Sequence, residues 1–130
     1  MERSELRIVI VDDNSEAAAA LARLTELSGF TVADQVYDAT KAFSRLAQER
    51  PHVALLDIAM PMLDGCTLAK RVRNLIVPTP LLIAVSGYGT LSDKQQAIEA
   101  GFNFHLTKPV DWQQLEEILL QHMMNLETAG

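Results

Sequence analysis

Five short runs suited to buried strands, separated by stretches of helical periodicity, constrain this chain more than any other feature. The runs cover Arg7–Val11, Thr31–Val36, Val53–Leu56, Leu81–Val85 and Asn103–Leu106. Strands that alternate with helices predict a parallel sheet with helices on both faces. The first and third runs are the most continuously apolar, as expected for central strands buried on both sides. The predicted class is therefore a doubly wound α/β fold.

Helical signals fill the intervals between the runs and follow the last one. In the first interval, apolar residues from Ala17 to Leu27 recur at helical spacing, and Gly29 can end that helix in a left-handed turn. The second helix is expected from about Asp38 to before Pro51, and the third over Cys66–Ile76. The fourth is expected to begin at a capping box of Ser92 and Gln95 and to end at Gly101. The last is expected to begin at a similar pair, Asp111 and Gln114, and to end at about Leu126. The final residues, ETAG, are expected to fray.

Length and charge limit the classes of protein that remain. With 130 residues the chain is expected to form one domain, residues 1–130, with its core at about 7–126. A net charge of −6 argues against nucleic acid and against anionic membrane surfaces as direct partners. Cys66 is the only cysteine, so an internal disulfide is excluded. The early charged residues do not resemble a signal peptide, and we expect a cytoplasmic location.

Polar residues stand where the predicted strands end. Asp12 and Asp13 follow the first run, Asp57 follows the third, Ser86 the fourth, and Lys108 lies just beyond the fifth. The carboxyl ends of parallel strands share one edge of a sheet, and ligands bind in the crevice there. Taken alone, Asp12 and Asp13 are equally well explained as turn or capping residues, and Lys108 as a solvated surface lysine. Asp57 already favours a functional role, because it ends a fully apolar strand. Together at one edge, they predict a functional site.

The residue types at this edge indicate phosphoryl chemistry. Three crowded carboxylates repel unless a cation lies among them, and oxygen ligands without His or Cys suit Mg2+. A lysine and a serine hydroxyl can neutralise and bind phosphoryl oxygens, which is most of what phosphoryl transfer requires. We therefore expect Asp57 to be a nucleophile that forms an aspartyl phosphate, with Lys108 and Ser86 assisting and Asp12 and Asp13 holding the metal.

Four motifs, in order and at the expected spacing, resemble one protein family. They read IVIVDDN, VALLDIAMPMLDG, IAVSGYG and HLTKPV, and the similarity extends from about Arg7 to Leu126. The chain resembles the receiver domain of response regulators in two-component signalling, either as a stand-alone receiver or as one attached to a hybrid sensor histidine kinase. The resemblance implies a flavodoxin-like sheet with strand order 2-1-3-4-5.

The resemblance also implies residue roles. Asp57 would accept a phosphoryl group from a histidine kinase or a histidine phosphotransfer protein. Asp13, Asp57 and the backbone carbonyl of Ala59 would bind Mg2+, with Asp12 acting largely through water. Lys108 would pair with the phosphate and precede a cis proline. Ser86 would move to form a hydrogen bond with the phosphoryl group, and this would reshape the surface of the fourth helix, fifth strand and fifth helix. A homodimer could form through that same surface. Such a domain is a switch and not a conventional enzyme, although it assists its own phosphorylation and dephosphorylation.

Two positions depart from the best-known receivers. His105 stands where Tyr or Phe is usual, three residues before the lysine, and we expect it to be an exposed switch residue or partner contact. Ala59, two residues after Asp57, carries no polar side chain to steer an attacking water. Receivers attached to hybrid kinases are the kind that this part of the sequence resembles most.

Two alternatives have other functions. A non-phosphorylated interaction module of the same fold is the first, although no acidic or lysine position of the motif is missing. A phosphatase of the haloacid dehalogenase type is the second. It needs an acid two residues after its nucleophile, where this chain has Ala59, and no cap insertion is present.

Overall fold

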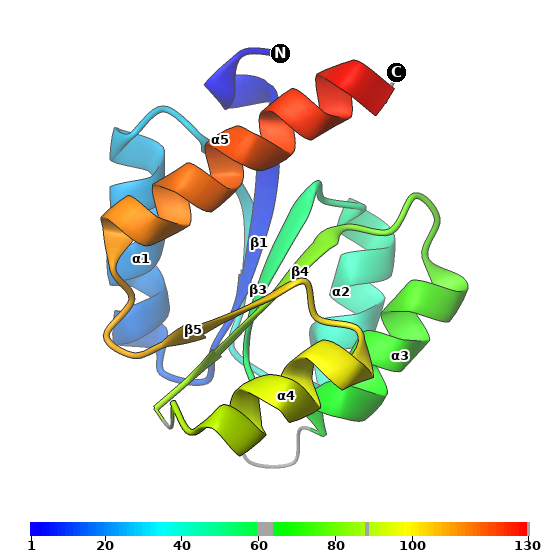
Figure 1. Cartoon of the computed structure of the whole chain (residues 1–130). Helices are drawn as coiled ribbons and strands as arrows, with labels where there is room; N and C mark the ends of the chain where they lie inside the picture. The colour runs from blue at the N-terminus through cyan, green and yellow to red at the C-terminus, as the bar shows by residue number, and fades with distance from the viewer. Residues whose placement is uncertain (60–63, 88, 130) are drawn as a thin grey trace.

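A single parallel sheet organises the chain. The computed structural model describes residues 1–59, 64–87 and 89–129, and its five strands lie in the order β2-β1-β3-β4-β5 (Figure 1), as predicted. The strands are β1 (Arg7–Val11), β2 (Thr31–Val36), β3 (Val53–Asp57), β4 (Leu81–Ser86) and β5 (Phe104–Thr107). The ladder extends one residue further than predicted in β3 and β4, because Asp57 pairs with Val85 and Ser86 pairs with Thr107.

In the part of the chain that the structure describes, five helices connect and follow the strands, with a 3-10 turn before β1 and another before the second helix. They are α1 (Ser15–Leu27), α2 (Ala42–Glu49), α3 (Gly65–Leu75), α4 (Leu91–Ala100) and α5 (Trp112–Ala129), with the turns at Arg3–Glu5 and Ala39–Lys41. Within the described ranges, no helix combines the length and the apolar character that a membrane crossing requires.

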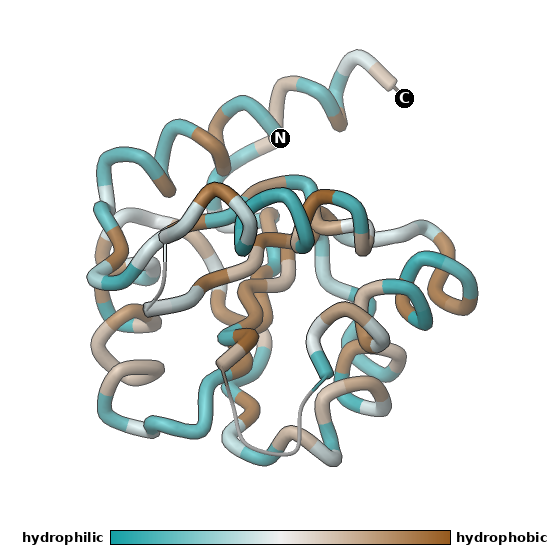
Figure 2. The backbone as a smooth tube through the Cα atoms, turned by 60° about the horizontal axis from the view of Figure 1, so that its bottom comes forward, coloured by the Kyte–Doolittle hydropathy of each residue, from teal (hydrophilic) through white to brown (hydrophobic). Residues whose placement is uncertain are grey.

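Two hydrophobic cores lie on opposite faces of the sheet. On one face, β-strand residues such as Ile10 and Leu55 pack with α1 and α5. On the other, residues such as Leu56 and Ala84 pack with α2, α3 and α4. Alternate side chains of a strand point to opposite faces, so a strand buried on both sides must be apolar throughout. Figure 2 shows the resulting hydrophobic strands at the centre and more polar helices around them.

Several helix ends follow the predictions and others do not. Arg50 leaves helical geometry before Pro51, and Gly29 and Gly101 adopt positive φ, as expected. The predicted capping box at Ser92 is wrong, because Thr90 caps α4 by accepting a hydrogen bond from the Asp93 N–H at 3.1 Å. The predicted fraying of the last residues is also wrong up to residue 129, since α5 continues that far.

Candidate functional site

The carboxyl edge of the sheet gathers the polar residues that the sequence placed at strand ends. Asp57 closes the central strand β3, and Asp12 directly follows β1 beside it. Both residues are almost fully buried, with exposed fractions of 5% for Asp57 and 8% for Asp12, whereas Asp13 is exposed. Asp12 and Asp57, which are 45 positions apart in the sequence, thus meet at one site.

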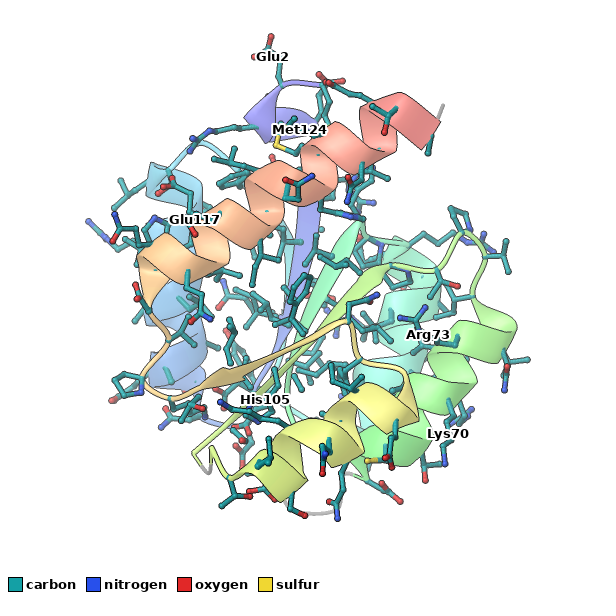
Figure 3. All side chains as sticks on the ribbon, in the orientation of Figure 1. Glu2, Lys70, Arg73, His105, Glu117 and Met124 are labelled. Carbon is teal, nitrogen blue, oxygen red and sulfur yellow. The ribbon has the colours of Figure 1, made fainter. Side chains whose placement is uncertain are left out.

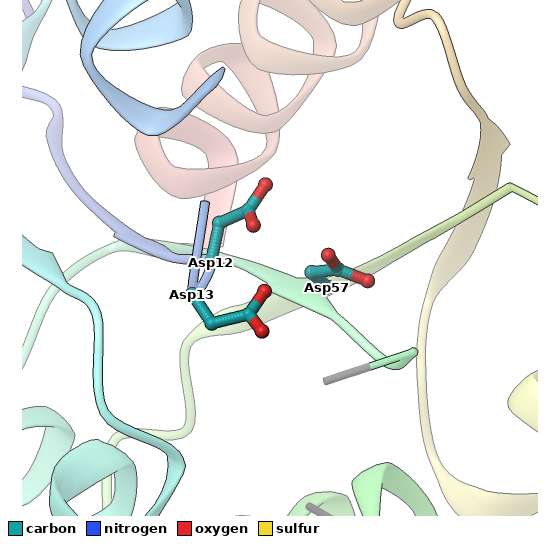
Figure 4. A group of neighbouring side chains, drawn as sticks. All are labelled: Asp12, Asp13 and Asp57. Atoms are coloured by element: carbon teal, nitrogen blue, oxygen red, sulfur yellow. The ribbon is translucent and has the colours of Figure 1, made fainter. Parts of the chain in front are cut away.

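The three aspartates form a compact acidic cluster. One carboxylate oxygen from each of Asp12, Asp13 and Asp57 lies within 4.8 Å of the others (Figure 4). Three hard oxygen donors at this separation suit a divalent cation such as Mg2+. The three carboxylates therefore fit Mg2+ as a ligand set.

Backbone hydrogen bonds fix Asp12. Its N–H donates to the Val36 carbonyl at 3.0 Å, and its Oδ1 accepts from the Asn14 N–H at 2.9 Å. Burial raises the pKa of the Asp12 carboxyl, and the negative charge of Asp57 adds to this increase. Asn14, which sequence reasoning left unassigned, thus supports Asp12 and also caps α1 by accepting from the Ala17 N–H. Its place in the motif IVIVDDN was the available signal.

Asp57 is held at both carboxylate oxygens. Oδ1 accepts from the Ala59 N–H at 2.9 Å, and Oδ2 accepts from Lys108 Nζ at 2.7 Å. The next residue, Ile58, donates its N–H to the Val85 carbonyl of β4, which continues the pairing beyond the end of β3. Asp57 is therefore oriented by the sheet itself and not by a free loop.

Lys108 supplies the positive charge within this cluster. Its Nζ lies 2.7 Å from Asp57 Oδ2 and 3.4 Å from Asp12 Oδ2. Burial by itself lowers the pKa of Lys108, but the hydrogen bond to Asp57 and the charges of both aspartates outweigh that effect, so its pKa lies above the usual value. The Lys108 N–H donates to the Ser86 carbonyl at 2.8 Å, and the bond to Pro109 is cis, as the resemblance implied.

A cavity of about 560 Å3 opens next to the acidic cluster on the α1 side of the sheet. Asp12, Asp57 and Lys108 form its polar end, and apolar residues of α1 and the strands form the rest. The small side chains of Ala17 and Ala20 leave this space. Open space therefore borders the Asp57 carboxylate on this side.

Ser86 is nearly buried, and its hydroxyl contacts His105. The two side chains share a hydrogen bond of 2.8 Å between Ser86 Oγ and His105 Nε2. His105 is half-buried, not exposed as predicted, because its ring lies against Ser86. Burial lowers the pKa of His105, and the nearby charge of Lys94 lowers it further.

Other residues considered from the sequence lie away from the cluster or make no contact with it. His52 accepts a hydrogen bond at Nδ1 from the Arg7 N–H, at the opposite end of the strands. Cys66 is a half-buried free thiol at the start of α3. Tyr88 of the SGYG motif lies outside the described residues.

Comparisons with known proteins agree on one family. A family model for the response regulator receiver domain matches residues 8–120. An uncharacterized 14.6 kDa protein of Leptolyngbya boryana is 34% identical over 122 residues, which cover 93% of this chain and 92% of that protein. The transcriptional regulatory protein PrrA of Mycobacterium tuberculosis is 36% identical over 103 residues, and this match covers 79% of this chain but only 43% of PrrA.

A solved structure gives the same result for the fold. The CheY-like response regulator receiver domain protein of Methanospirillum hungatei superposes with a TM-score of 0.83. The two chains are 27% identical, and the alignment covers 95% of this chain and 98% of that one.

Proposed function

Because this chain belongs to the family of response regulator receiver domains, we propose that it is a phosphoacceptor switch in a two-component or phosphorelay pathway. The observation that carries the proposal is the environment of Asp57. It is a nearly buried carboxylate at the end of the central strand, with Lys108 Nζ 2.7 Å away and two further aspartates beside it. An aspartate that served only as a turn residue would need none of these neighbours.

In the proposed reaction Asp57 is the nucleophile. One of its carboxylate oxygens attacks the phosphorus of a phosphohistidine in the donor protein, and a new O–P bond forms. The N–P bond breaks, and its electron pair stays on the donor's imidazole nitrogen. The product is an aspartyl phosphate on Asp57. The rigid position of the carboxylate, fixed by the Ala59 N–H, favours this attack.

The neighbouring groups have separate tasks in this proposal. Lys108, which now contacts Asp57 Oδ2, pairs with a phosphoryl oxygen and balances its charge. The Ser86 hydroxyl donates a hydrogen bond to another phosphoryl oxygen after it turns toward Asp57. Asp12, Asp13, Asp57 and the carbonyl of Ala59 would hold Mg2+, which would neutralise negative charge on the carboxylates and the phosphoryl group.

The partners follow from the same role. A histidine kinase or a histidine phosphotransfer protein is the phosphodonor. A downstream protein partner binds the surface of α4, β5 and α5, or a second copy of this chain binds there to form a homodimer. The chain assists its own phosphorylation and dephosphorylation and is not a conventional enzyme. The net charge of −6 disfavours a direct role in nucleic-acid binding. We expect the protein and its partners to be cytoplasmic.

Intact-mass measurement after incubation with acetyl phosphate tests the proposal. We expect one phosphoryl adduct that requires Mg2+, is present in the wild type and is absent from Asp57→Ala. Glu117→Gln is the matched control, because it removes an exposed carboxylate from α5 without touching the cluster. A stable adduct in Asp57→Ala would contradict the assignment. No adduct in the wild type, with Mg2+ binding verified separately, would leave two possibilities: a receiver that needs its own phosphodonor protein, or a non-phosphorylated interaction module.

A further inference from the structure

Ser86 and Asp57 direct their side chains to opposite faces of the sheet. Leu55 packs with α1 and α5, and Asp57, two residues later in β3, belongs to the same face. Ala84 packs on the side of α2, α3 and α4, and Ser86, two residues later in β4, belongs to that other face. His105 is the β5 partner of Ala84 and shares its face. The Ser86 hydroxyl thus meets His105 on the side away from Asp57.

The cavities beside the two residues show the same separation. The space of about 560 Å3 that Asp57 and Lys108 border does not include Ser86. Ser86 instead borders a cavity of about 500 Å3 that does not include Asp57. Asp93 and Gln96 of α4 border this cavity, as do Ile58 and Ala59, which follow β3. The strand order also separates Asp57 from His105, because β4 lies between β3 and β5. A hydroxyl directed at His105 therefore points toward the strand opposite the one that carries Asp57.

The contact between Ser86 and His105 is short and shielded from water. Ser86 Oγ and His105 Nε2 are 2.8 Å apart, and only 4% of Ser86 is exposed. Figure 3 shows the His105 side chain on the α4 side of β5. A phenylalanine at this position has no atom that could make this bond.

We propose that His105 is a positioning residue that holds the Ser86 hydroxyl on the α4 side and so opposes its transfer to a phosphoryl group on Asp57. This inference rests on the proposed function, because it concerns the hydroxyl that is to bind the phosphoryl group. Ser86 cannot keep its present bond and reach Asp57 unless His105 moves with it. The bond therefore adds to the free energy that a phosphoryl group must supply before Ser86 moves to it.

The expected change in affinity for a phosphoryl mimic follows from the net free energy that one hydrogen bond contributes. A bond of this kind contributes a net amount that corresponds to about a two- to tenfold change in an equilibrium constant. Removing the ring nitrogens should therefore strengthen binding of a phosphoryl mimic by about that factor, because Ser86 no longer has to leave His105. A purely structural contribution of His105 would weaken binding or leave it unchanged.

Titration with beryllofluoride in the presence of Mg2+ measures this competition, with amide NMR shifts as the readout. His105→Phe removes both ring nitrogens, and His105→Gln restores a polar group at the reach of Nε2. Ser86→Ala removes the hydroxyl, and the double variant completes a cycle. We expect tighter binding in His105→Phe, an affinity close to wild type in His105→Gln, and no effect of His105→Phe in the Ser86→Ala background.

Each other outcome overturns a defined part of the reasoning. Unchanged or weaker binding by a folded His105→Phe refutes the role of His105, as does the same gain in the Ser86→Ala background. If His105→Phe does not fold, His105→Leu replaces it under the same criteria. Absence of beryllofluoride binding by the wild type, or its persistence in Asp57→Asn, refutes the proposed function and this inference with it. Binding by the wild type without a gain in His105→Phe refutes this inference alone.

Discussion

Replacing Asp13 with asparagine should stabilise the metal-free protein, although Asp13 is a proposed metal ligand. Its carboxylate lies within 4.8 Å of those of Asp12 and Asp57, and Lys108 contacts the latter two but not Asp13. Asp13 is exposed, so the dielectric constant of water applies, and each repulsion is worth about 0.9 kcal/mol at 4.8 Å. Asp13→Asn removes two such repulsions and also the attraction between Asp13 and Lys108, which offsets part of the gain. The free energy of unfolding should therefore rise by about 1 kcal/mol at low salt.

Urea unfolding followed by circular dichroism measures this difference. The gain should shrink by roughly half at physiological salt, where the Debye length is about 8 Å. Saturating Mg2+ should reverse the order, since the wild type binds the ion with one more carboxylate and gains more from it. Glu117→Gln, which removes one charge from an exposed site on α5, should change stability little. A less stable Asp13→Asn protein without Mg2+ would refute the repulsion argument.

Three further changes test the packing, the helix end and the histidines. Leu119→Ala removes a fully buried side chain of α5 and should cost about 2–5 kcal/mol in urea unfolding, whereas Leu119→Met should cost much less. Thr90→Ala removes the N-cap of α4 and should cost about 1 kcal/mol, with Thr90→Ser near wild type. Burial lowers the pKa of both His52 and His122, so the folded state favours their neutral forms. The stability that these neutral forms confer is complete above a pH of about 6.5 and decreases as the pH falls below it. Urea unfolding at pH 7.5 and 5.5 measures this loss. The free energy of unfolding should fall less between these two pH values in His122→Gln than in the wild type.

The strands and the site edge were predictable because they depend on local pattern and on topology. A continuously apolar run such as Val53–Leu56 has few alternatives to a buried parallel strand. Once the strands are parallel, their carboxyl ends must meet, which places Asp57 beside Asp12 without knowledge of any distance. The predicted ends of β3 and β4 were one residue short, because Asp57 and Ser86 are polar yet still belong to the ladder.

The remaining features depend on choices between near-equal local options or on contacts across the sheet. Both Thr90 and Ser92 are followed three residues later by a side chain that fits a capping box, and the chain uses the earlier one. The bond between Ser86 and His105 joins two strands, and nothing in either segment indicates that the ring turns inward. Sequence pattern therefore located the reacting groups better than it described the contacts that restrain them.

The two chain ends lie together, far from the acidic cluster. The ammonium group of Met1 pairs with Glu127 near the end of α5, and Figure 1 shows both termini at the end of the sheet opposite to where the strands finish. A tether attached at either terminus would leave Asp57 facing outward, so the protein can be immobilised on a sensor surface with its reactive edge accessible. A short peptide could also join the termini, which makes the chain a suitable subject for circular permutation.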